Sequence, residues 1–279
     1  MSEPGALVSA DEAAVLATGW SPQADRALAL IAAAGRGTRL GFHQPKLLYP
    51  IEGRALVVWL TERLAGLVGR LTLVLSPDGR SAFEAAAPEL DLPVTTVVQQ
   101  SPTGMADAIL AAESELCAAD APPTAVILWG DQIGVRRETL IRALAVHARH
   151  PLRPAVTVPL ARVAAPYVHY EFDANRRLTA VRQRREGDLL PDVGDADCGC
   201  FVVSSSRVFP ILRRLRSSSL LEGALSHEQN FLQALPFIDR EAPVVAVRGA
   251  TLADTIGLNS TADLARLARA TTPPGHSPA

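Results

Sequence analysis

Residues 29–51 read "ALIAAAGRGTRLGFHQPKLLYPI", an apolar run that turns abruptly into glycines, with an arginine and a lysine downstream. A short run of this kind is typical of a strand buried on both faces of a parallel sheet. Ligands of open α/β sheets bind at the carboxyl ends of such strands. Gly35 and Gly37 have no Cβ, so their backbone N–H groups can approach phosphate oxygens closely. We therefore expect a phosphate-binding loop after this strand.

From Ala27 onward, apolar runs alternate with helical stretches. Apolar runs predict strands at Ala27–Ala34, Leu71–Ser76, Val94–Gln99 and Ala125–Trp129, with helices at Leu56–Leu67, Ser81–Ala87, Met105–Cys117 and Arg137–His150. Alternating strands and helices predict βαβ units and a mostly parallel sheet. After Pro151, strands at Ala155–Ala161, Tyr167–Phe172, Thr179–Gln183 and Cys198–Val203 predict an antiparallel insert. Helices at Arg207–Leu215, Gln229–Leu235 and Thr261–Ala270, and a strand at Val244–Val247, complete the expected fold.

These patterns divide the chain into three parts. We expect an N-terminal extension over 1–24, one α/β domain over 25–271 and a disordered tail over 272–279, which reads "TPPGHSPA". Within the domain, the parallel part covers about 25–150 and the insert about 151–250.

Composition excludes several classes of protein. The net charge of −2, with both signs scattered, predicts no nucleic-acid partner, and no apolar run reaches membrane-spanning length. The three cysteines form no C-x-x-C pair and predict unpaired thiols in a cytoplasmic protein.

Two common phosphate motifs are absent from the opening stretch. A dinucleotide fingerprint needs glycine at position 40, which is Leu40, and a P-loop needs G-K-[ST]. A lone G-x-G is usually no more than a turn into a helix. However, Lys46 is the only lysine among 27 basic residues. A chain so rich in arginine keeps a lysine where a compact, flexible ammonium is needed, so Lys46 favours a functional loop.

Four motifs, in order along residues 27–267, resemble those of the sugar-1-phosphate nucleotidyltransferases. They are "AAGRGTRL" followed by Pro45 and Lys46, "QQSPTGMADAI" at 99–109, "ILWGD" ending at Asp131, and "GLNSTADLARL" at 257–267. The first and last are closest to the N-acetylglucosamine-1-phosphate uridylyltransferase domain. The second is closest to the glucose-1-phosphate thymidylyltransferases.

The resemblance implies a GT-A-like, doubly wound mixed sheet with an antiparallel sugar-binding insert. It implies an enzyme that condenses a nucleoside triphosphate, UTP or dTTP ahead of others, with a sugar 1-phosphate, using Mg²⁺ and releasing pyrophosphate. It also allows a homo-oligomer. In the resemblance Arg39, Lys46 and Asp131 are catalytic, and Asp131 and Asn259 hold the metal. Nucleotide contacts would come from Ala32, Ala33, Ala34, Gly35, Gly37, Thr38, Gln99, Thr103 and Gly104, and sugar contacts from Trp129, Arg182 and Asp197.

Several alternatives stay open at this point. Asp131 and Asn259 could each cap the helix that follows. Asp254 is a rival metal ligand, and Gln100 is a rival of Gln99. The insert also departs from the family: "VRQR" places Arg182 where an acid is usual, and Asp197 replaces an asparagine.

The function has alternatives as well. The chain could transfer a nucleotide to another phosphorylated alcohol, such as a cyclitol phosphate. It could also be a catalytically silent homologue that binds nucleotide sugars and regulates a partner.

Overall fold

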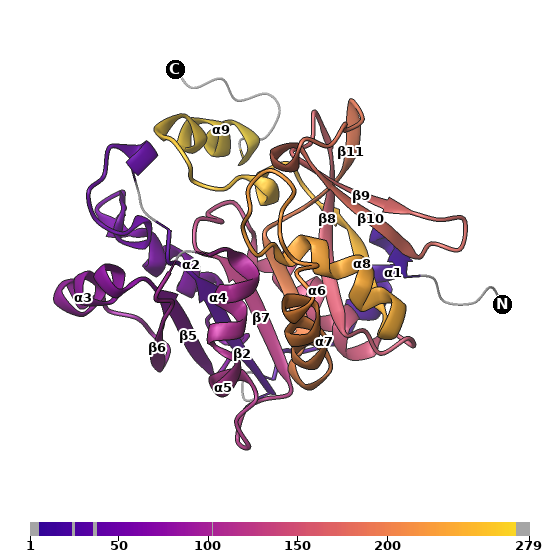
Figure 1. Cartoon of the computed structure of the whole chain (residues 1–279), viewed down its shortest axis with the longest axis horizontal. Coiled ribbons are helices and arrows are strands. Elements are labelled where there is room, and N and C mark those ends of the chain that lie inside the picture. Colours follow the sequence, from indigo (N-terminus) through magenta and orange to yellow (C-terminus); the bar gives the residue numbers. More distant parts are fainter. Residues whose placement is uncertain (1–5, 24–25, 36–37, 102, 272–279) are drawn as a thin grey trace.

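The fold is built on a nine-stranded mixed sheet with the strand order β1-β13-β8-β12-β7-β2-β5-β6, and β11 pairs with β8. This computed structural model describes residues 6–23, 26–35, 38–101 and 103–271 (Figure 1). Most neighbouring pairs in the sheet are parallel, whereas β12 runs antiparallel to both β7 and β8. The expected α/β class with a mixed, mostly parallel sheet is confirmed. Gly37 and the tail 272–279 lie outside the described residues.

The strands lie close to the expected runs. They are β1 (Leu7–Val8), β2 (Ala27–Ala32), β3 (Pro50–Ile51), β4 (Arg54–Ala55), β5 (Arg70–Leu75), β6 (Val94–Val98), β7 (Thr124–Trp129), β8 (Val156–Ala164), β9 (Val168–Phe172), β10 (Leu178–Gln183), β11 (Val193–Asp197), β12 (Cys200–Ser204) and β13 (Val244–Ala250).

The α-helices follow the same pattern. They are α1 (Ala10–Ala17), α2 (Leu56–Leu64), α3 (Pro77–Ala86), α4 (Met105–Ala111), α5 (Glu113–Leu116), α6 (Arg137–Arg149), α7 (Ser205–Ser217), α8 (Phe231–Glu241) and α9 (Thr261–Thr271). Short 3₁₀ turns include η3 (Lys46–Leu48) and η5 (Ala253–Thr255).

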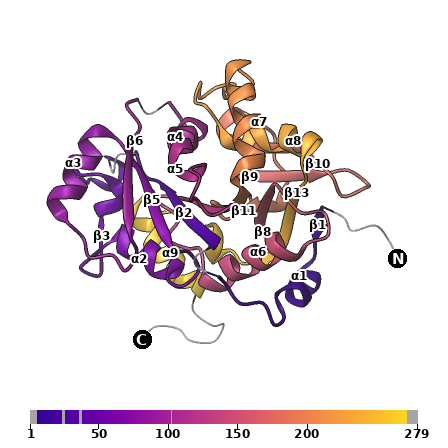
Figure 2. The ribbon, with the colours of Figure 1, turned by 90° about the horizontal axis from the view of Figure 1, so that it is seen from below.

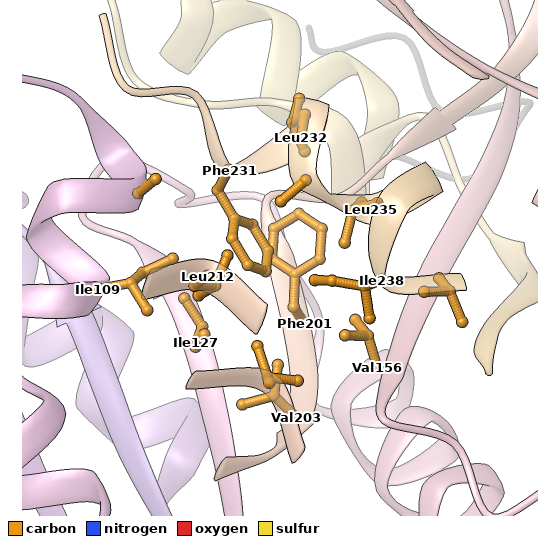
Figure 3. Close-up of a cluster of buried hydrophobic side chains, with 14 of the residues drawn as sticks. Ile109, Ile127, Val156, Phe201, Val203, Leu212, Phe231, Leu232, Leu235 and Ile238 are labelled. Carbon is orange, nitrogen blue, oxygen red and sulfur yellow. The ribbon is translucent and has the colours of Figure 1, made fainter. Parts of the chain in front are cut away.

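Helices cover both faces of the sheet, which is why β2 reads as a continuous apolar run. Successive side chains of a strand point to opposite faces, and every residue of β2 is buried. Leu28 and Leu30 pack in one cluster with α4, α7 and α8, whereas Ala29 and Ile31 pack in a second cluster with α2 and α6. Figure 2 shows the two helical layers on either side of the sheet. Figure 3 shows part of the first cluster, in which the rings of Phe201 and Phe231 pack edge to face, 5.1 Å apart between centroids.

The chain reverses its direction of travel across the sheet at β2. From β2 it moves to β5 and β6, and then returns to β7 on the other side of β2. The carboxyl ends of β2 and β7 therefore flank the point where loops diverge, which is where ligands bind in doubly wound sheets.

Three segments differ from the expectation in their place in the sheet. Residues 7–17, expected within an N-terminal extension, form β1, which pairs with β13, and α1, which begins with a capping box of Ser9 and Glu12. The strand expected at Cys198–Val203 is β12, and it lies inside the main sheet between β7 and β8 rather than in a separate insert. The strand expected at Ala155–Ala161 is β8, and it too lies in the main sheet, between β13 and β12. Of the strands expected in the insert, β9 and β10 form a separate two-stranded sheet, and β3 and β4 form another elsewhere in the chain.

Candidate active site

A cavity of about 1060 Å³ opens at the carboxyl ends of β2 and β7. We call the part lined by Gly35, Arg39, Lys46, Asp131 and Asn259 the Lys46 end. We call the part lined by Gln183, Arg185, Asp197, Glu228 and Asn230 the far end. Segments that are remote in sequence thus share one cavity. In Figure 1, α9 lies above the sheet between the segment after β2 and the strands β8, β9 and β11.

The Lys46 end depends on a close approach between the chain segments that leave β2 and β7. The Gly130 N–H donates to the Ala32 carbonyl at 2.9 Å, and a Cβ at Gly130 would lie 2.7 Å from that oxygen. No side chain fits there without a shift of the backbone. The glycine of "ILWGD" therefore lets the next residue, Asp131, enter the cavity beside the loop that follows β2.

Three predicted site residues meet at the Lys46 end. The Lys46 ammonium donates to Asp131 Oδ2 at 2.9 Å and to Asn259 Oδ1 at 3.1 Å. The backbone holds Lys46 in place, because its N–H donates to the Gly35 carbonyl at 3.5 Å and the adjoining Leu47 and Leu48 are buried. The only lysine of the chain is thus hydrogen-bonded to the two side chains expected to bind metal.

The helix-cap alternative has no support at either position. The helix after Asp131, α6, has Arg136 at its N-cap position and no side-chain cap. Asn259 directs its amide oxygen to Lys46, and the start of α9 is held instead by Asp263, which accepts from the N–H groups of Asn259 and Ser260. Burial opposes ionisation of Asp263, but these N–H groups outweigh it and hold its pKa below the usual range.

Asp254, the rival metal ligand, is fully buried and has a structural role. Its carboxylate accepts from the backbone and guanidinium of Arg136, from the Thr139 hydroxyl and from Thr251. Burial opposes ionisation, but the Arg136 and Thr251 hydrogen bonds outweigh it and hold the Asp254 pKa below its usual range. Asp254 thus fastens η5, which precedes Asn259, to α6.

The remaining predicted residues of the opening stretch lie along the same wall. Ala32, Ala33, Gly35 and Arg39 line the cavity, and Arg39 is exposed. Ala34 is half-buried beside them. Thr38 begins a 3₁₀ turn, but its side chain, like Gly37 as a whole, lies outside what the structure describes.

The second motif lies differently from the expectation. Gln99 and Thr103 line a separate depression of about 660 Å³, together with Asp107 and Arg216. The Gln99 amide donates to the Gly104 carbonyl at 3.1 Å. Gln100, the rival of Gln99, is exposed and lines the same depression.

Gly104 is needed for packing against another part of the chain. A Cβ there would lie 2.5 Å from the backbone of Gln229, so in that direction Gly104 is covered by protein. Gly104 also has a φ of +125°, which favours glycine.

Two of the predicted sugar-reading residues reach the cavity. Trp129 packs on Phe201 and Phe231, at 4.9 and 6.1 Å between ring centroids, and Asp197 follows on β11. Burial raises the pKa of the Asp197 carboxyl, and the Gly199 N–H, which donates to it at 2.8 Å, opposes that rise. The Tyr170 hydroxyl lies 3.4 Å from the other oxygen of Asp197.

The third sugar-reading residue, Arg182, requires a correction. Its side chain points away from the cavity and pairs with Glu171 at 3.2 Å. The next residue of β10, Gln183, is the one that lines the cavity, and its amide oxygen accepts from Asn230 at 2.8 Å. A strand turns alternate side chains to opposite faces, so a difference of one residue decides which side chain can meet a ligand.

Sequence reasoning missed several residues of the cavity wall. Gln132 donates to the Asp254 carbonyl at 2.8 Å, next to Asp131, and the far end holds Gln183, Arg185 and Asn230. The sequence could have pointed to Gln132, because it directly follows the motif "ILWGD" that ends at Asp131. Asn230 caps α8 through Leu232, and a capping asparagine carries no separate signal for a ligand.

The donors at the Lys46 end fit a magnesium ion. Asp131 and Asn259 supply a carboxylate and an amide oxygen that already share one cation, the Lys46 ammonium. Within the described ranges, no group of three or more His, Cys, Asp or Glu side chains could hold a metal. A site with few protein ligands is the kind in which substrate phosphates complete the coordination of Mg²⁺.

The fold and this site define a doubly wound α/β protein with Lys46, Asp131 and Asn259 clustered at the switch point of its sheet. Comparison with known families specifies the family: the MobA-like NTP transferase domain matches residues 29–228, and the chain belongs to this family. The resemblance drawn from the four motifs is thereby confirmed.

Curated relatives agree with this assignment at modest identity. The chain is 29% identical to the "Bifunctional protein GlmU" of Zymomonas mobilis over 194 residues, which cover 68% of this chain and 42% of the relative. It is 27% identical to the protein of the same name from Anaeromyxobacter dehalogenans over 246 residues, 86% of this chain and 48% of the relative. The aligned regions thus span half or less of these relatives' length. Among the described residues, no helix has the length and apolar character of a membrane span.

Proposed function

We propose that the chain is a nucleotidyltransferase that condenses a nucleoside triphosphate, UTP or dTTP ahead of others, with a sugar 1-phosphate. The products would be an NDP-sugar and pyrophosphate. The observation that carries the proposal is the meeting of Lys46, Asp131 and Asn259 at the carboxyl ends of β2 and β7. The match to the MobA-like NTP transferase domain and the similarity to the curated GlmU relatives support nucleotidyl transfer to a sugar phosphate. The free cysteines fit a cytoplasmic enzyme.

In the proposed reaction, an oxygen of the sugar phosphate attacks the α-phosphorus in line, and the bond from that phosphorus to the leaving pyrophosphate breaks. Negative charge grows on the bridging and leaving oxygens, so catalysis is mainly positioning and electrostatic stabilisation. Arg39, exposed on the cavity wall, would bind the leaving phosphates. Lys46 would bridge the α-phosphate and the incoming sugar phosphate.

Asp131 and Asn259 would hold Mg²⁺, which supplies charge neutralisation at the phosphate oxygens when bound. The far end of the cavity would receive the sugar. When ionised, the Asp197 carboxylate can only accept hydrogen bonds, so it would select hydroxyl or amino groups on the ligand.

The test is a panel of five nucleoside triphosphates against common sugar 1-phosphates and cyclitol phosphates, with Mg²⁺, read out as pyrophosphate release. Release with one pair, and loss of it in Asp131→Asn, supports the proposal. Turnover with a cyclitol phosphate alone would reassign the acceptor. Tight binding of a nucleotide sugar with no turnover for any pair would overturn the proposal in favour of a regulatory role.

A further inference from the structure

The Lys46 ammonium occupies the position that joins the two proposed metal ligands. It contacts Asp131 Oδ2 at 2.9 Å and Asn259 Oδ1 at 3.1 Å, and the Lys46 side chain is only 16% exposed. Both oxygens are the hard donors that a divalent cation would use. A metal that takes both oxygens must displace the ammonium, because two cations cannot share them without strong repulsion.

Lys46 can leave this position without disturbing the fold. Its anchor is η3, where Leu47 and Leu48 are buried and the Lys46 N–H bonds the Gly35 carbonyl, while the ammonium ends a flexible four-carbon stem. The loop that carries Lys46 is also the loop expected to receive phosphates. Phosphate oxygens arriving there offer the ammonium a second set of acceptors.

We propose that Lys46 is an internal cation that keeps divalent metal off Asp131 and Asn259 until nucleotide phosphates draw the ammonium away. This proposal rests on the proposed function for the identity of the nucleotide. Metal binding then depends on bound nucleotide, and by thermodynamic linkage metal increases nucleotide affinity by the same factor. The site would therefore assemble only around a substrate.

The test measures Mn²⁺ binding in the absence of nucleotide, by electron paramagnetic resonance of free Mn²⁺. We expect Lys46→Gln to bind Mn²⁺ about tenfold to hundredfold more tightly than the wild type, the factor that corresponds to a hydrogen bond between charged groups. The matched control, Lys46→Arg, keeps the charge and should bind Mn²⁺ as weakly as the wild type. Adding Asp131→Asn to Lys46→Gln should abolish the gain.

Equal or weaker binding by Lys46→Gln overturns the proposal, as does a gain that survives Asp131→Asn or a complete lack of Mn²⁺ binding. A second measurement uses the wild-type protein, so the proposal can still be tested if a variant fails to fold. Lysine labelled with ¹³C at Cε gives one side-chain resonance, and Mg²⁺ should shift it only at a concentration high enough to displace the ammonium without nucleotide. An unmoved resonance while calorimetry shows Mg²⁺ binding also overturns the proposal. Neither measurement uses nucleotide. A panel without pyrophosphate release would therefore reject the proposed function, whereas the Mn²⁺ and Mg²⁺ measurements would still decide the role of Lys46.

Discussion

The two ends of the cavity are built in different ways. At the Lys46 end, side chains separated by 85 and 213 positions in sequence lie within hydrogen-bonding distance of one ammonium. Lys46 and Asp131 each follow a parallel strand of the main sheet. At the far end, Gln183 comes from the small sheet β9–β10 and Asn230 from the start of α8. Strands of the main sheet therefore lead to two of the three residues at the first end, whereas Gln183 and Asn230 at the second depend on the small sheet and on the start of a helix.

The largest expected effect tests the Lys46 end. Lys46→Arg keeps the charge but replaces a compact donor with a planar one that cannot take the same place between two phosphates. We expect kcat to fall by roughly 10²–10³, about 2.7–4 kcal/mol, with little change in KM for the nucleotide. Steady-state kinetics measures both. The matched control is Arg80→Lys, which exchanges the same residue types in an exposed pair with Glu84 and should leave kcat unchanged. A kcat for Lys46→Arg within twofold of the wild type would remove Lys46 from the chemistry.

The next prediction tests whether Asp254 stabilises the fold or binds the metal. Asp254→Asn weakens the fully buried carboxylate that holds Arg136 and Thr251. We expect the free energy of unfolding to fall by about 3 kcal/mol, near the low end for breaking a buried pair, because Arg136 is partly exposed. Urea unfolding measures this loss. Mn²⁺ affinity of Lys46→Gln should not change when Asp254→Asn is added; a lost metal site would instead make Asp254 a ligand.

A smaller effect is expected at the far end. Asp197→Asn replaces an acceptor-only carboxylate by an amide, so one hydrogen bond to the sugar is lost. We expect KM for the sugar 1-phosphate to rise about tenfold, with KM for the nucleotide unchanged. Asp192→Asn, a substitution of an exposed acid just before β11, is the control. A rise in KM for the nucleotide instead would mean that the nucleotide, and not the sugar 1-phosphate, binds at the far end.

The smallest effect concerns the strand that forms the far wall. Arg182→Ala removes a half-exposed side chain that pairs with Glu171 outside the cavity. We expect stability and KM for the sugar 1-phosphate to stay within about 0.5 kcal/mol of the wild type. Gln183→Ala, one residue further along β10, is the comparison and should raise that KM. The reverse result would mean that β10 presents its other face to the ligand.

The sequence predicted the Lys46 end better than the far end for a physical reason. Carboxyl ends of neighbouring parallel strands converge, so a residue placed directly after an apolar run can be assigned to the site without coordinates. Asp131 stands at such a position, and both Asp131 and Asn259 were assigned through the motifs of the resemblance. Arg182 was misplaced because the two faces of a strand differ by one residue, and a family pattern cannot decide which face meets the cavity.

Long-range contacts account for most of the remaining differences. Gly104 packs against the backbone of Gln229, and nothing near Gly104 in sequence indicates that partner. Strand β1 has only two residues, too few for a detectable alternation, yet it extends the sheet beside β13. The place of β12 between β7 and β8 likewise depends on pairing partners that a linear pattern does not name.

The single lysine has a practical consequence for anyone who handles the protein. Reagents that acylate amines find one lysine side chain in the whole chain, and it lines the cavity. Attachment to a sensor surface by amine coupling would therefore use either the α-amino group or the site itself. The same property turns a simple acylation into an occupancy assay, because a ligand that covers Lys46 should protect the only reactive lysine from the label.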